Sequence, residues 1–168
     1  MAHITAKNAY KSLEERINKF PQGAPPSKTL YQILSILFTE EEARLVAKLP
    51  IKAFRLKTAA NIWNVSQSEA YKILDNLAKK ALILDLEDNK GKKYILPPPM
   101  AGFFEFSMMR TRQDIDQKLL AELYYQYINE EEDFIKELFY STDTKLGRVY
   151  VQEEVLTNEN EVTILDYE

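Results

Sequence analysis

The sequence contains no cysteine, and this absence excludes several kinds of chemistry. Without thiols the chain forms no disulfide, offers no thiolate nucleophile and holds no iron–sulfur cluster through cysteine. A chain free of cysteine also fits a reducing compartment. We therefore expect a cytoplasmic protein that binds no cofactor through its own residues.

Histidine and glycine are also scarce. His3 is the single histidine and lies near the terminus, where side chains are rarely held in place. A serine–histidine–aspartate triad or a histidine metal site is therefore not expected. The glycines Gly23, Gly91, Gly102 and Gly147 stand apart, so neither a P-loop nor a dinucleotide-binding turn is present in the sequence. We expect no enzymatic activity.

Long apolar runs are absent as well. No run approaches the roughly 18 residues that a membrane-spanning helix needs, and the first residues lack the basic-then-apolar pattern of a secretory signal. The 168 residues are 45% hydrophobic and 29% charged, and they include eight Phe, ten Tyr and one Trp. This composition favours a folded core, and we expect no membrane partner.

Charge is unevenly distributed along the chain. The net charge is −4, yet residues 27–96 carry 12 Lys or Arg against 8 Asp or Glu, a net +4, and the remainder carries 10 against 18, a net −8. The overall charge argues against indiscriminate binding to nucleic acid. The acidic run at 130–133 could bind a hard cation, but acidic residues in a first helical turn are explained by the helix dipole, so we expect no metal site.

Apolar residues recur at helical spacing in the first third of the chain. They predict a helix over residues 8–20, followed by a linker rich in proline at 21–26. A second helix is expected from Ser27 or Lys28. Thr39 is expected to cap a third, which ends before Pro50.

The segment 56–96 carries the most specific pattern. It predicts a short helix ending near Trp63, a turn at Asn64-Val65, and a long helix that begins with Ser66 and Glu69 as a capping box. Alternating leucines from 82 to 86, a turn at 88–91 and a returning segment at 92–96 predict a β-hairpin. A helix-turn-helix followed directly by a hairpin is typical of a winged helix.

Three prolines at 97–99 end the returning strand and mark a domain edge. Beyond them we expect an aromatic linker, a helix from about 114, another from about 129 or 130, and an extended tail from 146 that contains the possible strands RVYV and VTIL. The predicted fold is mainly α with a small β-hairpin. It comprises an N-terminal helix and linker (1–26), a winged helix-turn-helix domain (27–96) and a helical C-terminal extension (97–168).

A winged helix suggests binding to duplex DNA, with the second helix in the major groove and the wing against the backbone. The residues expected to make these contacts are Gln67, Ser68, Tyr71 and Lys72 on the helix and Lys90, Lys92 and Lys93 on the wing. The signal is thin, because Glu69 and Asp75 share the helix, no arginine lies on it, and Glu87 and Asp88 flank the wing lysines. The alternative is that the fold serves as a protein-contact module and that the lysines are simply solvated.

The stretch 100–109 offers a second candidate surface. Its large apolar residues could form an adaptable patch that contacts another domain or a second copy of the chain; these are Phe103, Phe104, Phe106, Met108 and Met109. Residues of this kind are more often part of a core. Packing of the stretch across the winged-helix domain is therefore the favoured interpretation, and a partner interface is the alternative.

Four stretches of the chain have a distinctive amino-acid sequence: RINKFPQGAPPS (16–27), LPPPMAGFFEFSMMR (96–110), DIDQKLLAELYYQY (114–127) and TKLGRVYVQE (144–153). They resemble the N-terminal region of larger bacterial and archaeal proteins that carry ferredoxin-type 4Fe–4S segments downstream, and the resemblance spans nearly the entire chain. In that family cysteine runs of the C-x-x-C-x-x-C kind hold the clusters. Because this chain has no cysteine, the resemblance implies a fragment that ends before the redox part.

The resemblance implies a non-catalytic interaction or regulatory module in an electron-transfer protein. Its expected partner is the downstream iron–sulfur domain or a redox partner protein, and a homodimer is a further alternative. From another functional class, a transcriptional regulator that binds duplex DNA is the second hypothesis.

Overall fold

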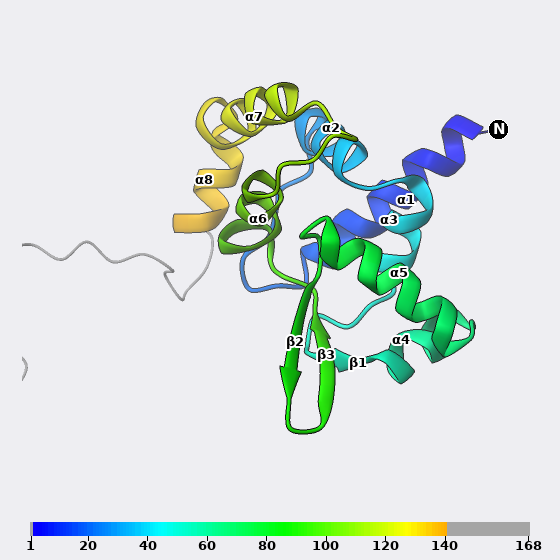
Figure 1. Ribbon diagram of the computed structural model, residues 1–168. Coiled ribbons are helices and arrows are strands. Elements are labelled where there is room, and N and C mark those ends of the chain that lie inside the picture. Colours follow the sequence, from blue (N-terminus) through cyan, green and yellow to red (C-terminus); the bar gives the residue numbers. More distant parts are fainter. Residues whose placement is uncertain (1, 141–168) are drawn as a thin grey trace, which may run out of the picture.

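The computed structural model describes the backbone of residues 2–140 and the side chains of residues 8–140 (Figure 1). The predicted extended tail at 146–168 lies outside the described residues. The described part is mainly helical and contains one small antiparallel sheet. Its elements are α1 (Ala2–Ile17), α2 (Lys28–Leu37), α3 (Glu40–Val46), β1 (Phe54–Arg55), α4 (Leu56–Trp63), α5 (Gln67–Lys79), β2 (Leu84–Asp88), β3 (Gly91–Ile95), η1 (Pro99–Phe103), α6 (Phe104–Met109), α7 (Gln117–Tyr125), η2 (Gln126–Glu130) and α8 (Glu132–Phe139).

Side-chain caps begin three of the helices where the sequence predicts them. Ser27 Oγ accepts a hydrogen bond from the Leu30 amide at 3.0 Å and caps α2. Thr39 caps α3, and the Glu42 carboxylate accepts a hydrogen bond from the Thr39 amide, so a full capping box forms there. Ser66 accepts from the Glu69 amide at 3.2 Å and caps α5. Each cap satisfies a backbone donor that has no partner within its helix.

α4 and α5 are joined by a tight turn that local chemistry explains. Asn64, which ends α4, adopts the left-handed conformation with φ 55°, and asparagine tolerates this region better than most residues. At the other end of α5, the Leu82 amide bonds to the Leu77 carbonyl at 3.0 Å, and Ala81 is left-handed with φ 58°. These features match a Schellman motif, which stops the helix and turns the chain directly into β2.

The predicted hairpin is present, and it belongs to a sheet of three strands. β2 and β3 pair from Leu84 opposite Ile95 to Asp88 opposite Gly91. β1, which the sequence pattern did not predict, pairs with the far side of β3, so the strand order is β1-β3-β2. Phe54 of β1 and Tyr94 of β3 stack with ring centroids 6.0 Å apart, and both are buried. The hairpin is therefore anchored to the core at its base and projects from the helices (Figure 1).

One continuous core runs through the predicted N-terminal, central and C-terminal segments. Its C-terminal part is a cluster of rings in mutual contact, drawn from Phe103, Phe104, Tyr124, Tyr127 and Phe134. Phe103 also meets Phe38, which follows α2, at 6.2 Å edge to face. The aromatic stretch expected as a linker is thus a kinked turn followed by helix α6, whose inner side completes the core. Among the described residues, no helix combines the length and the apolar character needed to cross a bilayer.

Candidate interaction surfaces

The helix residues predicted to read DNA lie on the exposed side of α5. Gln67, Ser68, Tyr71 and Lys72 are all exposed, and Tyr71 retains 44% of its surface. Lys92 and Tyr94 of β3 lie within electrostatic range of Tyr71, which places this side of α5 next to the hairpin. The exposed side of α5 and the Lys92 face of the hairpin therefore lie in the same region of the molecule.

Carboxylates neutralise most of the cations of the hairpin, on both of its faces. Asp88 accepts two hydrogen bonds from the Arg55 guanidinium, both at 2.9 Å, and Lys93 Nζ lies 3.8 Å from the same carboxylate. Asp85 accepts from Lys92 Nζ at 2.7 Å. The hydrogen bond from Arg55 lowers the pKa of Asp88, and the hydrogen bond from Lys92 lowers the pKa of Asp85. Both carboxylates therefore stay charged and oppose the cations beside them.

The same matching extends to the helix. Lys79 Nζ lies 2.7 Å from Asp75, one turn away. Among the lysines predicted to contact DNA, Lys72 and Lys90 form no ion pair with the described residues. Of the four lysines predicted to contact DNA, two are thus already matched with carboxylates of the hairpin.

The two faces of the hairpin differ in character. Residues that are opposite or two apart share a face of a sheet. One face therefore carries Leu84, Leu86 and Ile95 together with Lys93 and Asp88, and the other carries Asp85, Glu87, Lys92 and Tyr94. Tyr94 is buried, so its face meets the core near the hairpin base. The face with Leu84, Leu86 and Ile95, called here the outer face, is partly open, and Leu86 is 45% exposed.

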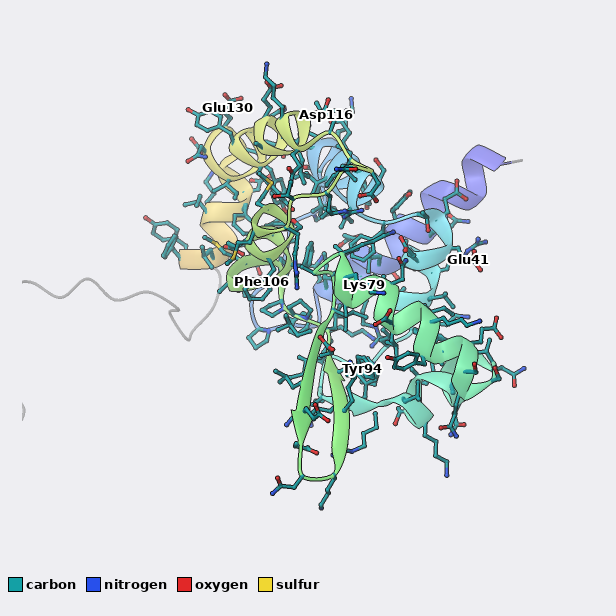
Figure 2. The ribbon with its side chains drawn as sticks, in the orientation of Figure 1. Glu41, Lys79, Tyr94, Phe106, Asp116 and Glu130 are labelled. Carbon is teal, nitrogen blue, oxygen red and sulfur yellow. The ribbon has the colours of Figure 1, made fainter. Side chains whose placement is uncertain are left out.

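Helix α6 lies on the β2 side of the hairpin and continues this apolar surface (Figure 1). A groove of about 340 Å³ separates the two and is called here the α6 groove; its lining residues are Ala81, Leu84, Phe106, Met109 and Arg110. Phe106 is half-buried on the side of α6 toward the hairpin base (Figure 2), and Met109 is 78% exposed. The lining is apolar apart from Arg110.

The predicted partner patch at 100–109 is therefore only partly surface. Phe103 and Phe104 are 1% and 3% exposed, so assigning a partner contact to them was wrong. Phe104 packs against rings of α7 and α8, and Phe103 packs against Phe38, which follows α2. Met108 and Met109 are exposed, and Phe106 and Met109 line the α6 groove. A contact of these three residues with a partner stays a prediction.

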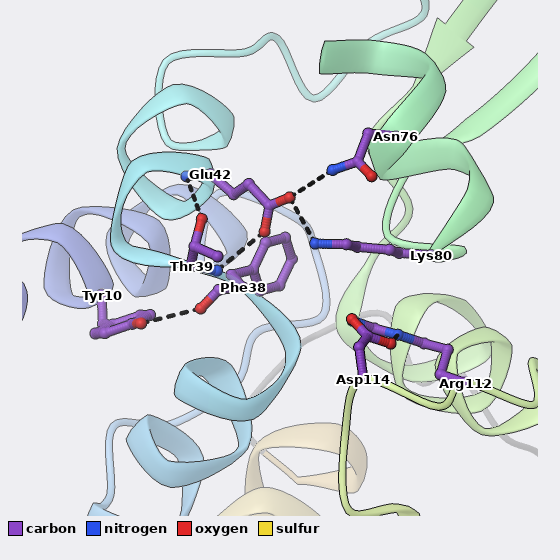
Figure 3. Close-up of polar contacts among 8 residues, drawn as sticks. All are labelled: Tyr10, Phe38, Thr39, Glu42, Asn76, Lys80, Arg112 and Asp114. Atoms are coloured by element: carbon purple, nitrogen blue, oxygen red, sulfur yellow. Dashed lines mark hydrogen bonds and ion pairs between the residues drawn. The ribbon is translucent and has the colours of Figure 1, made fainter. Parts of the chain in front are cut away.

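A partly buried polar junction, centred on the buried Glu42, joins α5 to α3 (Figure 3). Glu42 Oε1 accepts hydrogen bonds from Asn76 Nδ2 at 2.8 Å and from Lys80 Nζ at 2.7 Å. Glu42 Oε2 accepts from the Thr39 amide at 3.0 Å. Glu42 was not singled out in the sequence analysis. The Thr39-x-x-Glu42 spacing of a capping box was the signal that distinguishes it from Glu40 and Glu41.

The acidic run at 130–133 is used for local structure. Glu131 accepts a short hydrogen bond from the Thr29 hydroxyl, and Glu132 pairs with Lys136 at 2.8 Å. Across the residues that the structure describes, no group of three His, Cys, Asp or Glu side chains converges as metal ligands would.

With this geometry established, the chain was compared with known proteins. No protein-family model, curated protein or solved structure matches it. The candidate surfaces are therefore interpreted from their own chemistry.

Proposed function

We propose that this chain is a non-catalytic docking module built on a winged helix, and that it binds a partner protein through the outer face and the α6 groove. The order α3, β1, α4, α5 and hairpin supports the winged-helix assignment, because a capped second helix runs directly into a two-stranded wing. The helices after the hairpin add α6, which supplies one wall of the groove.

The observation that carries the proposal is the neutralisation of the hairpin cations. Arg55, Lys92 and Lys93 are matched by Asp85 and Asp88, so the wing presents little net charge to a polyanion. Binding to DNA draws its affinity largely from unpaired cations that release counterions from phosphates. Leu86 is exposed on the outer face of the hairpin, and Leu84 and Met109 line the adjoining groove, as expected for a protein contact.

Duplex DNA is the second candidate ligand, and a specific observation favours it. Tyr71, Lys72 and Lys90 are exposed on the surface shared by α5 and the hairpin tip, and no carboxylate neutralises these two lysines within the described residues. A winged helix would place them against the major groove and the backbone. We rank DNA second because Glu69 and Glu87 lie on the same two elements.

The partner that we propose is an iron–sulfur protein region. The basis is the resemblance of the sequence to regions that precede ferredoxin-type 4Fe–4S segments. Lacking cysteine, this chain would contribute the contact surface and no cluster ligand. Its role would then be to orient or regulate an electron-transfer domain.

The test measures two affinities of the chain. The first is for a mixed-sequence DNA duplex, titrated at several salt concentrations, beside a variant with Lys90, Lys92 and Lys93 replaced by Ala. We expect weak binding that these changes hardly alter. Submicromolar affinity that falls in the triple variant would overturn the ranking and favour the DNA-binding regulator.

The second affinity is for the cysteine-containing region expected downstream in the parent polypeptide, reconstituted with its clusters and added in trans. We expect Met109→Glu to weaken this binding about tenfold, because it places a charge in an apolar contact. Tyr125→Glu is the matched control, since Tyr125 is 61% exposed on α7. Equal losses in both variants would remove the α6 groove from the proposal, and a parent polypeptide without a cysteine-containing region would remove the iron–sulfur partner.

A further inference from the structure

β2 forms the open edge of the sheet. In the order β1-β3-β2, β3 has a neighbour on each side, whereas β2 pairs with β3 alone among the described residues. The central residues of β2, from Asp85 to Glu87, are exposed. An open edge of this kind presents backbone N–H and C=O groups without partners, which can pair with another extended chain.

The two faces of β2 carry different chemistry. Leu84 and Leu86 lie on the outer face, while Asp85 and Glu87 lie on the opposite face. Because side chains of a neighbouring strand share faces with those of β2, a strand added at this edge must alternate in the same way. Its residues beside Leu84 and Leu86 would be apolar, and those beside Asp85 and Glu87 would be polar.

The α6 groove lies directly beside this edge. Leu84 belongs both to β2 and to the lining of the groove, and Phe106 and Met109 of α6 form the opposite wall. Sites that bind extended peptides combine a strand edge for backbone pairing with a pocket for alternate side chains. The groove of about 340 Å³ provides such a pocket for the apolar residues of an added strand.

The charges on β2 distinguish between two possible occupants of its open edge, a second copy of this chain and a strand of a different protein. β2 carries Asp85, Glu87 and Asp88, and no ion pair is seen for Glu87 within the described residues. A second copy that paired β2 with β2 around a two-fold axis centred on Leu86 would place Asp85 opposite Glu87 of the partner copy, and like charges directly opposite are destabilising. Asp85 is already paired with Lys92, so Glu87 is the carboxylate on this face of β2 that a basic residue of an added strand would complement.

We infer that the partner docks by strand addition: an extended protein segment with alternating apolar and basic residues pairs with β2 and places its apolar side chains in the α6 groove. This inference rests on the proposed docking function and specifies how the contact is made. The backbone of β2 supplies affinity, and Glu87 together with the groove selects the partner sequence.

The experiment uses the full chain and three dye-labelled heptapeptides, followed by fluorescence anisotropy. The probe alternates Lys and Val, a second peptide contains the same residues in two blocks, and a third alternates Glu and Val. We expect the alternating Lys–Val peptide to bind at least about tenfold more tightly than either other peptide, and to slow amide hydrogen exchange at Leu84–Asp88. Glu87→Lys should weaken this binding about tenfold. Glu130→Lys, at an exposed site on η2 (Figure 2), is the matched control and should leave it unchanged.

Several outcomes would overturn strand addition. These are equal binding of the alternating and block peptides, no effect of Glu87→Lys, no protection of β2 amides, or no binding of the Lys–Val peptide. A wild-type chain that sediments as a dimer, and becomes monomeric after Leu86→Pro, would assign the edge to a second copy. If the peptides do not bind, but the iron–sulfur region binds and Met109→Glu weakens that binding, strand addition is wrong and the docking function is retained. If neither the peptides nor that region binds, both fall.

Discussion

Two of the places where opposite charges meet in this chain differ in burial. At the junction of α3 and α5, the side chains of Glu42 and Lys80 are 11% and 19% exposed and lie 2.7 Å apart. On the hairpin, the pairs Arg55–Asp88 and Lys92–Asp85 have similar distances, but all four side chains are 34% to 40% exposed. The same chemistry thus operates in two dielectric environments.

The difference in burial assigns the two clusters different roles. A buried charge that loses its partner has no water to replace it, so the Glu42 junction determines where α5 sits on α3. Exposed pairs are screened and contribute little to stability. These exposed pairs instead reduce the net positive charge that the hairpin presents to a ligand. This reduction is the reason for ranking a protein partner above DNA.

The largest effect is expected from removing the buried carboxylate. Glu42→Ala leaves Lys80 and Asn76 without their acceptor and breaks the capping box of α3, so we expect a loss of about 3 kcal/mol in the free energy of unfolding. Urea denaturation followed by circular dichroism measures it. Glu41→Ala, one position earlier and exposed, is the control and should change stability by less than about 0.5 kcal/mol.

A double-mutant cycle sharpens this prediction. If the loss in Glu42→Ala comes from an unpaired Lys80, then adding Lys80→Met should recover part of it, because the buried cation is gone. Additive losses in the double variant would mean that the pair does not stabilise the junction, and the contrast with the hairpin would disappear.

The next effect concerns binding and tests the hairpin. Replacing both Asp85 and Asp88 by Asn releases the cations that they neutralise, and we expect about tenfold tighter binding to duplex DNA at low salt. The salt dependence should steepen by about two phosphate contacts. The thermal unfolding transition should stay close to that of the wild type, because these pairs are exposed.

Asp114→Asn is the matched control for the DNA titration, since Asp114 is an exposed carboxylate whose ion pair is with Arg112 and not with a cation of the hairpin. If the double variant binds DNA no better than the wild type, the hairpin carboxylates do not suppress DNA binding, and the principal argument for a protein partner is lost.

Local chemistry explains why much of the fold could be predicted from the sequence. Thr39 and Ser66 define helix starts through hydrogen bonds to amides three residues away, so the sequence alone is enough to place them. The turn that ends α5 and the hairpin after it are equally local. β1 was missed because two residues carry no periodic signal, and its only definition is pairing with β3, nearly forty residues later.

The candidate site depends on longer-range information. Phe103, Phe104, Phe106 and Met109 are all apolar within seven residues, and no local pattern tells which rings turn inward. Their separation is set by contacts with α7, η2 and α8, far along the chain. The neutralisation of Lys92 by Asp85 likewise depends on the folded hairpin, although the acidic residues near the wing lysines were visible in the sequence.

Arg112 and Asp114 form an intermediate case between the two clusters and are expected to give the smallest effect. The Arg112 side chain is 7% exposed, with Nη1 buried and unpartnered among the described residues, whereas Asp114 is 58% exposed. Hydrogen bonds from Arg112 at 2.9 and 2.7 Å lower the pKa of Asp114 from its ordinary 3.8 to about 2. The carboxyl carbon of Asp114, followed by nuclear magnetic resonance, should therefore titrate near pH 2.

The sign of the pH dependence follows from this lowered pKa. A carboxyl that is more acidic in the folded state stabilises the fold above about pH 4, and this contribution is lost as the pH falls from 4 toward 2. Asp114→Asn should reduce that acid-induced loss only slightly, because the exposed carboxylate is screened. Glu130→Gln is the control and should leave the acid limb unchanged. If Asp114 instead titrates near pH 3.8, a buried arginine alone does not strengthen an ion pair whose carboxylate faces water. A strong ion pair would then require that both partners be shielded from water, as Glu42 and Lys80 largely are.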